Sequence, residues 1–191
     1  MEMTPNEREA DVLIVNTCSF IDMAKRESIG TVEDAIDGRS SDKKRQKQKI
    51  IVAGCLSQRF SKELPGLMPE VDAFIGIDQV SRIGAIVREA VARRAAASPA
   101  IVDLHARPTY LPDCKTPRFR LTPRHHAYLK IAEGCNHPCS FCVIPRVRGP
   151  YRSRAPGDLL EEARRLIGEG VREINLISQD STYYGRDLRA G

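Results

Sequence analysis

The sequence predicts an α/β protein, with a parallel sheet covered by helices followed by one further βαβ unit. Short runs rich in Val and Ile alternate with segments of helical periodicity in the first half, and the alternation returns once near the end of the chain. A stretch with five prolines separates these two regions. We therefore expect a first domain over 1–97, a linker over 98–124 and the start of a second domain over 125–191.

The first domain is predicted to follow the order βαβαβα. Its strands are expected where β-branched residues cluster, at 11–15, 50–53 and 71–75. The first helix is predicted to be capped by Ser19 or Asp22 and to run to about Ile36, and the polar stretch 38–49 is expected to be a fraying helix end and a loop. A short second helix should stop before Pro65, and a third should run from a cap at Ser81 to about Ala97.

The second domain is predicted to begin with a strand at 127–131 that leads directly into a cysteine-rich loop. A helix capped by Asp158 should follow and run to Glu169, with Gly170 ending it. A second strand is expected at 171–177, and it ends in Ser178, Gln179 and Asp180. Two parallel strands and one helix make a single βαβ unit.

Composition excludes several classes of protein. Hydrophobic residues make up 41% of the 191 residues, charged residues make up 29%, and Trp is absent, as in soluble globular chains. The longest apolar runs are far shorter than the roughly 18 residues that a transmembrane helix needs. The polar first residues lack the apolar core of a signal peptide. We therefore expect a cytoplasmic protein with no membrane partner.

The net charge of +5 is concentrated in the second half of the chain. Residues 1–98 carry 15 basic and 15 acidic side chains, whereas 99–191 carry 15 and 10. Nine basic residues and one acid, Glu133, fall within 115–154. This region is expected to meet an anionic partner such as nucleic acid, a ribonucleoprotein, or a small ligand with phosphate or carboxylate groups, although a solvated basic face would have the same composition.

Three of the six cysteines, Cys135, Cys139 and Cys142, form a C-x-x-x-C-x-x-C array after a predicted strand. A structural zinc site needs four protein ligands, and His137, followed by Pro138, is a poor candidate for the fourth. Thiolates also ligate iron–sulfur clusters, and three of them leave one of four irons open to a substrate or cofactor.

The other three cysteines are isolated in the sequence. Cys18 and Cys55 follow the first two predicted strands, so they should lie at the carboxyl edge of the parallel sheet, where ligands of such sheets bind. A small buried thiol is the alternative for each of them. Cys114 lies in the linker and receives no role.

The cysteine array, with Phe141 directly before its last Cys, resembles the signature of the radical S-adenosylmethionine superfamily. The resemblance implies that Cys135, Cys139 and Cys142 hold a 4Fe–4S cluster whose fourth iron binds S-adenosylmethionine. Reductive cleavage of S-adenosylmethionine then yields a 5′-deoxyadenosyl radical. The protein's part is to bind and orient the reactants and to shield them from solvent. It also implies a partial (β/α) barrel that begins with the βαβ unit.

Further segments resemble the methylthiotransferases within this superfamily and together cover nearly the whole chain. They are Val15–Asp22, Ala53–Cys55, Leu121–His125, Tyr128–His137, Val143–Gly149 and Ile177–Asp180. The residues of these motifs are most similar to the branch that adds a methylthio group to the β-carbon of an aspartate in a small-subunit ribosomal protein. The sister branch, which modifies an adenosine in tRNA, is the alternative.

The methylthiotransferase resemblance also implies a second 4Fe–4S cluster, with Cys18 and Cys55 matching two of its three ligands. The third ligand belongs to an earlier strand, and family members continue beyond the βαβ unit, so we expect a chain truncated at both ends. The implied partners are the ribosome or its small-subunit protein and a flavodoxin-type reductant, with RNA contact through the basic residues of 115–154.

Two other hypotheses remain at this stage. A metal-stabilised module could bind RNA or the ribosome without catalysis, and the chain could be a non-functional remnant. Lys130 and Glu133 flank the cysteine strand, and Ser178, Gln179 and Asp180 end the next one. Each of these fits a structural role as well as a contact to a cofactor.

Overall fold

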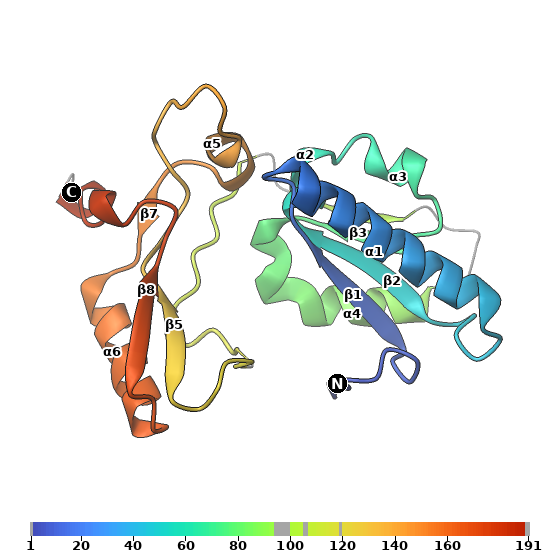
Figure 1. The fold of residues 1–191 in the computed structure, drawn as a ribbon, viewed down its shortest axis with the longest axis horizontal. Helices are drawn as coiled ribbons and strands as arrows, with labels where there is room; N and C mark the ends of the chain where they lie inside the picture. Colours follow the sequence, from blue (N-terminus) through green and yellow to red (C-terminus); the bar gives the residue numbers. More distant parts are fainter. Residues whose placement is uncertain (1, 94–99, 105–106, 119, 190–191) are drawn as a thin grey trace. The chain divides into compact units, whose positions relative to one another are not determined.

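Parallel strands organise both parts of the chain, which confirms the α/β class predicted from the sequence (Figure 1). The computed structural model describes residues 2–93, 100–104, 107–118 and 120–189. The chain divides into a first unit, Met1–Pro108, and a second unit, Thr109–Gly191. The finer assignment of 1–97, 98–124 and 125–191 to two family domains and a linker stays a prediction.

The first unit contains a four-stranded parallel sheet in the order β1-β2-β3-β4. Its strands are β1 (Val12–Thr17), β2 (Lys49–Gly54), β3 (Ala73–Ile75) and β4 (Ile101–Asp103). The pairing of Thr17 with Gly54 places the carboxyl ends of β1 and β2 side by side.

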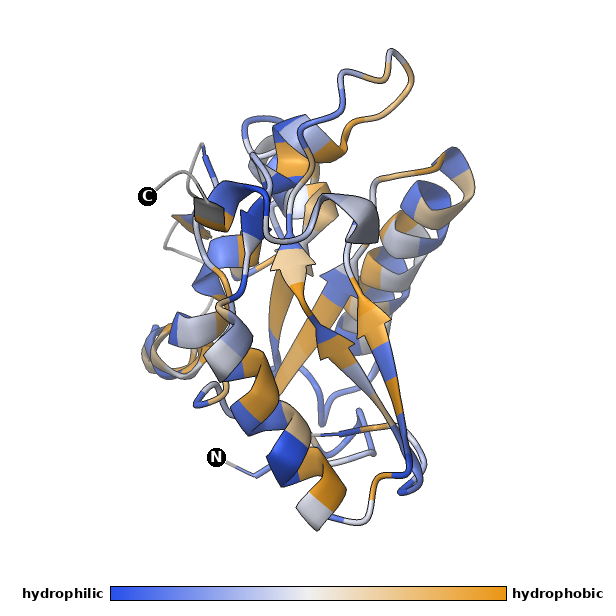
Figure 2. Ribbon diagram, turned by 90° about the vertical axis from the view of Figure 1, so that its left-hand side faces the viewer, coloured by the Kyte–Doolittle hydropathy of each residue, from blue (hydrophilic) through white to orange (hydrophobic). Residues whose placement is uncertain are grey.

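Helices cover both faces of this sheet, with α1 (Asp22–Ser41) and α4 (Ile83–Ala92) on opposite sides (Figure 1). Because side chains alternate along a strand, Ile50 and Val52 of β2 pack with α1 and the short helices α2 (Cys55–Arg59) and α3 (Leu64–Leu67). Ile51 packs on the other face with α4. Figure 2 shows the result, with strands coloured mainly hydrophobic and helices striped.

Several predicted boundaries in the first unit are wrong. Helix α1 continues to Ser41, beyond the end predicted near Ile36 and into the segment predicted to be a fraying helix end and loop. There Arg39 pairs with Asp72 at 2.9 Å and donates to the carbonyl of Glu70. Neither Ser19 nor Asp22 caps it, since the N-cap residue is Ile21. The short helix α2 does stop before Pro65, as predicted, but Pro65 itself lies in the first turn of a further helix, α3, that was not expected.

The region around α4 also differs from the prediction. A 3-10 helix, η1 (Ile77–Arg82), contains Ser81 and leads into α4, whose N-cap is Arg82. Strand β4 lies in the predicted linker and pairs with β3. It was not predicted because its three residues are too short a run to give a recognisable pattern. The predicted helix end at 94–97 lies outside the described residues.

The second unit is built on two parallel strands, β5 (His126–Lys130) and β8 (Glu173–Ile177), with α6 (Pro156–Gly168) between them in sequence. Ala127, Leu166 and Val171 form the core where α6 packs on these strands. An antiparallel pair, β6 (Ala132–Glu133) and β7 (Arg152–Ser153), closes a long loop that carries α5 (Ile144–Arg148). Two 3-10 helices, η2 (Ser181–Tyr183) and η3 (Asp187–Arg189), follow β8.

The ends of α6 contain one wrong and one confirmed prediction. Asp158 does not cap the helix, which begins at Pro156 after the N-cap Ala155. Gly170 ends it as predicted, with a φ of 90°. The N–H of Gly170 bonds the carbonyl of Ile167, and the N–H of Val171 bonds that of Leu166, which is the Schellman pattern.

Membrane insertion is not supported by any described helix. Within the described ranges, no helix is both long and apolar enough to cross a bilayer.

Candidate functional site

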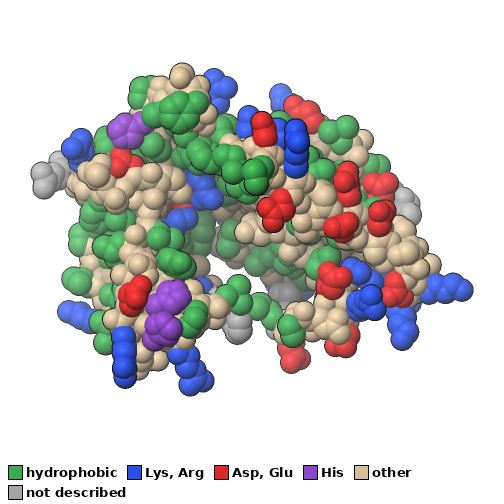
Figure 3. Space-filling model, in the orientation of Figure 1, with side chains coloured by type: hydrophobic (Ala, Val, Ile, Leu, Met, Phe, Trp, Pro, Cys, Tyr) green, Lys and Arg blue, Asp and Glu red, His purple; other side chains and the backbone are tan. Residues whose placement is uncertain are grey.

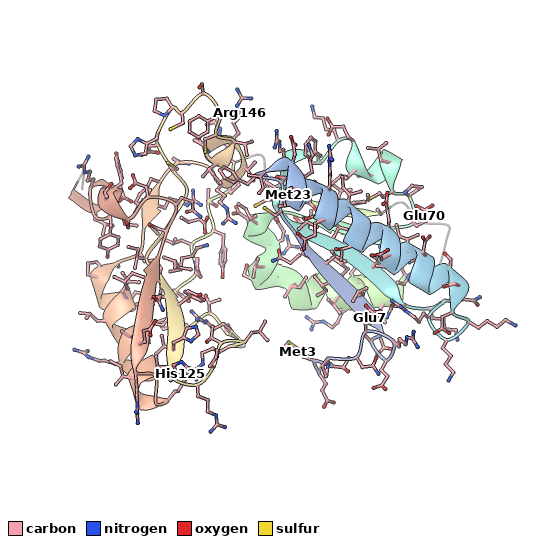
Figure 4. The ribbon with its side chains drawn as sticks, in the orientation of Figure 1. Met3, Glu7, Met23, Glu70, His125 and Arg146 are labelled. Carbon is pink, nitrogen blue, oxygen red and sulfur yellow. The ribbon has the colours of Figure 1, made fainter. Side chains whose placement is uncertain are left out.

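The cysteine loop, defined here as residues 134–143, lies in the second unit between β6 and α5. Figure 4 shows Arg146 on α5, next to this loop, and His125 at the opposite end of the unit, before β5. The loop therefore lies at the carboxyl ends of β5 and β8. This is the edge of a parallel sheet at which ligands bind.

The first residues of the cysteine loop are held closely against the segment that leads to β7. Gly134 has a φ of 81°, and a Cβ placed on it would come within 2.6 Å of the Gly149 carbonyl oxygen and closer still to that of Pro150. The N–H of Cys135 donates to Gly149 at 3.2 Å, and the Asn136 side chain accepts from the N–H of Tyr151 at 2.9 Å. Glycine is required at 134 because other residues rarely adopt this conformation.

The three thiols of the cysteine loop are accessible. Cys139 is exposed, Cys135 and Cys142 are partly buried, and none of the three is in a disulfide. The N–H of Cys142 donates to the carbonyl of Cys139, which closes a turn over 139–142. In the described part of the chain, no three Cys, His, Asp or Glu side chains are grouped closely enough to hold a metal ion. The donor set nevertheless fits an iron–sulfur cluster, because thiolates are its protein ligands.

Two residues after β8 contact the cysteine loop. The Gln179 side-chain oxygen accepts from the N–H of Gly134 at 3.0 Å, and Asp180 Oδ2 lies 2.8 Å from His137 Nε2. The pKa of Asp180 is lowered, chiefly by the hydrogen bond from Thr182 and then by the one from His137. The sequence places Gln179 and Asp180 at the end of a strand, but nothing in it pairs Asp180 with His137.

Directly before the cysteine loop, Glu133 is buried between two cations. Its carboxylate pairs with Lys130 and with Arg148, the latter at 2.6 Å. Burial alone would raise the pKa of Glu133, but the charges of Lys130 and Arg148 outweigh it and lower the pKa. In the structure both predicted flanking residues, Lys130 and Glu133, serve in this ion-pair cluster.

Cys18 and Cys55 follow β1 and β2, whose carboxyl ends are paired at Thr17 and Gly54. The buried Ser19 hydroxyl donates to the carbonyl of Cys55 at 3.0 Å, which ties the two cysteine segments together. Cys18 is exposed and Cys55 is partly buried. The structure therefore brings these two residues to the same sheet edge, as the strand pattern predicts.

Cys114 differs from the other five cysteines because it is buried against α6. Its N–H donates to Asp158 at 2.7 Å, and its carbonyl accepts from Arg165 at 2.5 Å. Hydrogen bonding to Asp158, followed by burial, raises the pKa of the thiol to about 11. Cys114 therefore stays protonated near neutral pH and is a poor metal ligand.

Many basic residues of 115–154 are engaged within the second unit. Arg118 and Arg154 both pair with the buried Glu162, at 2.9 and 2.7 Å. Lys130 and Arg148 pair with Glu133, and Arg152 donates to the carbonyl of Pro150. Side chains of Lys115, Arg124 and Arg146 are exposed. Basic side chains predominate over acidic ones on the visible face of this unit (Figure 3).

Comparisons with known proteins cover both units. Residues 1–76 match the family model described as uncharacterized protein family UPF0004, and residues 129–189 match the radical SAM superfamily. Relatives in Opitutus terrae, Akkermansia muciniphila and Geotalea uraniireducens are 54%, 52% and 48% identical over 189, 190 and 190 residues. Those alignments cover 98%, 98% and 100% of this chain, and all three relatives are named ribosomal protein uS12 methylthiotransferase RimO.

Over nearly its whole length the chain is therefore similar to radical S-adenosylmethionine methylthiotransferases. The resemblance inferred from the motifs is thereby confirmed, including its ribosomal-protein branch. The chain spans only 40% to 41% of the length of these three relatives. The match to the radical SAM superfamily implies S-adenosylmethionine and an iron–sulfur cluster as cofactors.

Proposed function

We propose that this chain carries the cluster-binding part of a methylthiotransferase that acts on a small-subunit ribosomal protein. The observation that carries the proposal is the identity of about half of its residues to relatives named ribosomal protein uS12 methylthiotransferase, over nearly its whole length. The reaction is the insertion of a methylthio group at the β-carbon of an aspartate.

Cys135, Cys139 and Cys142 are proposed as ligands of the 4Fe–4S cluster that binds S-adenosylmethionine. Their support is the shared accessible loop and the absence of disulfides among the described cysteines. When bound and reduced, the cluster supplies the electron that cleaves S-adenosylmethionine. The chain's own part is to hold the loop at the sheet edge through Gly134 and Asn136.

Cys18 and Cys55 are proposed as ligands of the second 4Fe–4S cluster. The support is their position after two paired strands and the hydrogen bond from Ser19 to the Cys55 carbonyl.

The proposed partners are the ribosomal protein uS12 that the relatives' names give, and a flavodoxin-type reductant for the cluster. Exposed basic residues such as Arg124 and Arg146 would contact ribosomal RNA near that substrate. Arg118, Lys130, Arg148 and Arg154 are already paired with Glu133 or Glu162, so the contact must depend on the exposed ones.

Anaerobic reconstitution with iron and sulfide tests the metal part of the proposal. The chain should bind about four irons through the cysteine loop, and S-adenosylmethionine should change the electron paramagnetic resonance spectrum of the reduced cluster. Cys139→Ala should lose most of that iron, whereas Cys114→Ala, a matched control, should keep it. Failure of the unaltered chain to bind iron, or stoichiometric zinc in its place, would overturn the assignment.

Mass spectrometry tests the substrate. With S-adenosylmethionine and a reductant, a full-length enzyme that contains this chain should add one methylthio group to an aspartate of uS12 and leave tRNA unmodified. Modification of tRNA alone would contradict the ribosomal-protein assignment.

A further inference from the structure

The two halves of the cysteine loop are held in different ways. Around Cys135, three hydrogen bonds reach two other segments: Gly134 bonds Gln179 after β8, while Cys135 bonds Gly149 and Asn136 bonds Tyr151 in the segment before β7. The second half, by contrast, contains the local turn in which the N–H of Cys142 donates to Cys139. The first cysteine is therefore tied to the sheet, and the other two share a self-contained turn.

His137 makes the outermost of the contacts that hold the first half. Its Nε2 donates to Asp180 Oδ2 at 2.8 Å, although more than half of the His137 side chain (56%) is exposed. The Asp180 side chain is only 13% exposed. An exposed ring directed at a largely buried carboxylate, 43 residues away in sequence, is a tertiary contact rather than a local turn.

Asp180 is also held by Thr182, independently of His137. Its other oxygen, Oδ1, accepts from the N–H of Thr182 at 3.0 Å and from the Thr182 hydroxyl at 2.7 Å. These two bonds fix the carboxylate at the start of η2, so that Oδ2 faces the loop. Thr182 and Asp180 thus form a rigid acceptor at the carboxyl end of β8.

We propose that His137 and Asp180 are positioning residues that fix the segment 135–137 before iron binds, so that Cys135 is preorganised while the turn 139–142 closes on the metal. The inference rests on the proposed function for the identity of the metal ligands. Its physical basis is that a ligand held in place beforehand loses less conformational freedom when the metal binds. Contacts that orient metal ligands in this way tune metal sites generally.

Hydrogen exchange in the metal-free chain tests the contact without any cluster. In the unaltered chain, the amides of 135–137 should exchange more slowly than those of 139–141. Asp180→Ala should speed exchange at 135–137 by about fivefold, the effect of one lost hydrogen bond. Asp113→Ala is the matched control, because Asp113 is an exposed aspartate of the same unit that bonds Thr116 in its own turn.

Thr182 provides a conservative test of the same contact. Thr182→Ala should speed exchange at 135–137 in the same direction as Asp180→Ala, and Thr182→Ser, which keeps the hydroxyl, should restore the slow rate. Unchanged exchange at 135–137 in Asp180→Ala would overturn the proposal. So would equal exchange rates in the two halves of the unaltered loop.

Iron uptake measures the consequence for metal binding. His137→Ala and Asp180→Ala should each slow the growth of the iron–thiolate absorption by about fivefold, and the double variant should be no slower than either. Final iron content should match that of the unaltered chain. Lower iron content in His137→Ala alone would make His137 a ligand and overturn the positioning role. Absence of iron uptake in every variant and in the unaltered chain would instead reject the proposed function, while the exchange data still decide the contact.

Discussion

Cys18 and Cys55 follow two strands that are hydrogen-bonded to each other, whereas Cys135, Cys139 and Cys142 share one loop. The distance between the first two is set by backbone register, which the sheet enforces along its length. The geometry of the other three depends on contacts of the loop, such as Gly134 with Gln179. The first arrangement can therefore be predicted from a strand pattern, and the second cannot.

The largest expected effect on stability comes from adding a Cβ at the glycine beside each group of cysteines. Gly134→Ala should lower the free energy of unfolding of the second unit by about 3 kcal/mol, because a left-handed residue would meet the Gly149 and Pro150 carbonyls. Gly54→Ala should act similarly in the first unit, since its φ is 101° and Thr17 O would lie 2.7 Å from the new Cβ.

Urea unfolding measures these glycine variants unit by unit. All five Tyr residues lie within 109–191, so tyrosine fluorescence reports on the second unit, and far-ultraviolet circular dichroism reports on both. Gly157→Ala is the control, because nothing lies within 4 Å of the added Cβ. If Gly134→Ala and Gly157→Ala were equally stable, the close approach at Gly134 would not exist in solution.

A smaller effect is expected from Asp158, whose carboxylate bonds the N–H of Cys114 and pairs with Arg154. Asp158→Asn should destabilise the second unit by about 1 to 2 kcal/mol at neutral pH, because the buried Arg154 keeps only Glu162 as a charged partner. Burial would raise the pKa of Asp158, but hydrogen bonds from Cys114 and the contact with Arg154 lower it below 3.8.

The sign of the pH dependence follows from that lowered pKa. The contribution of Asp158 is complete above 3.8, its unfolded-state value, and is lost as the pH falls through the lower folded-state value. The stability gap between the unaltered chain and Asp158→Asn should therefore shrink only in acid. Urea unfolding followed by tyrosine fluorescence, from about pH 7 to about pH 3, measures it. A gap that widens in acid would contradict the assignment.

The hydrogen bond that joins the Cys18 and Cys55 segments should contribute less to the free energy of unfolding. Ser19→Ala removes the hydroxyl that donates to the Cys55 carbonyl in a buried position and should cost the first unit about 1 kcal/mol. Circular dichroism in urea measures the change. Ser40→Ala is the control, because its hydroxyl bonds Ile36 within an exposed helix, and an equal loss in both variants would count against a special role for Ser19.

The smallest effect is expected at Phe141, which is 87% exposed beside Cys142. Phe141→Ala should change the stability of the metal-free second unit by no more than about 0.5 kcal/mol. Tyrosine fluorescence in urea tests this. A loss above about 1 kcal/mol would mean that the ring packs in the folded chain and that the loop is held more tightly than its contacts indicate.

The first three strands were predicted better than the loops because a run of β-branched residues is a local signal. Residues 50–53, for example, were expected to form a strand and lie within β2. The end of α1 at Ser41 was not placed, because local pattern does not show that Arg39 meets Asp72, 33 positions away. Helix α5, which follows the cysteine loop, was not predicted because five residues, one of them Pro145, give too short a pattern.

The site was predicted in the same uneven way. The spacing of Cys135, Cys139 and Cys142 and the matching motifs pointed to the residues that we propose as ligands. The partners of those ligands were not visible, because His137 and Asp180 are joined only when the chain folds. The role of Asp158 was misassigned for the same reason, since Arg154 and Cys114 compete for a carboxylate that sequence alone would give to a helix cap.

The burial of Cys114 gives the chain a built-in chemical reporter. Alkylating reagents attack thiolates, so a thiol with a pKa of about 11 and 6% exposure is labelled far more slowly than the exposed Cys139. In a mass spectrum, the last label to appear would therefore mark the moment at which the segment around Cys114 leaves α6. Timed alkylation can thus follow the opening of the second unit in a mixture, without a fluorescent tag or a purified enzyme.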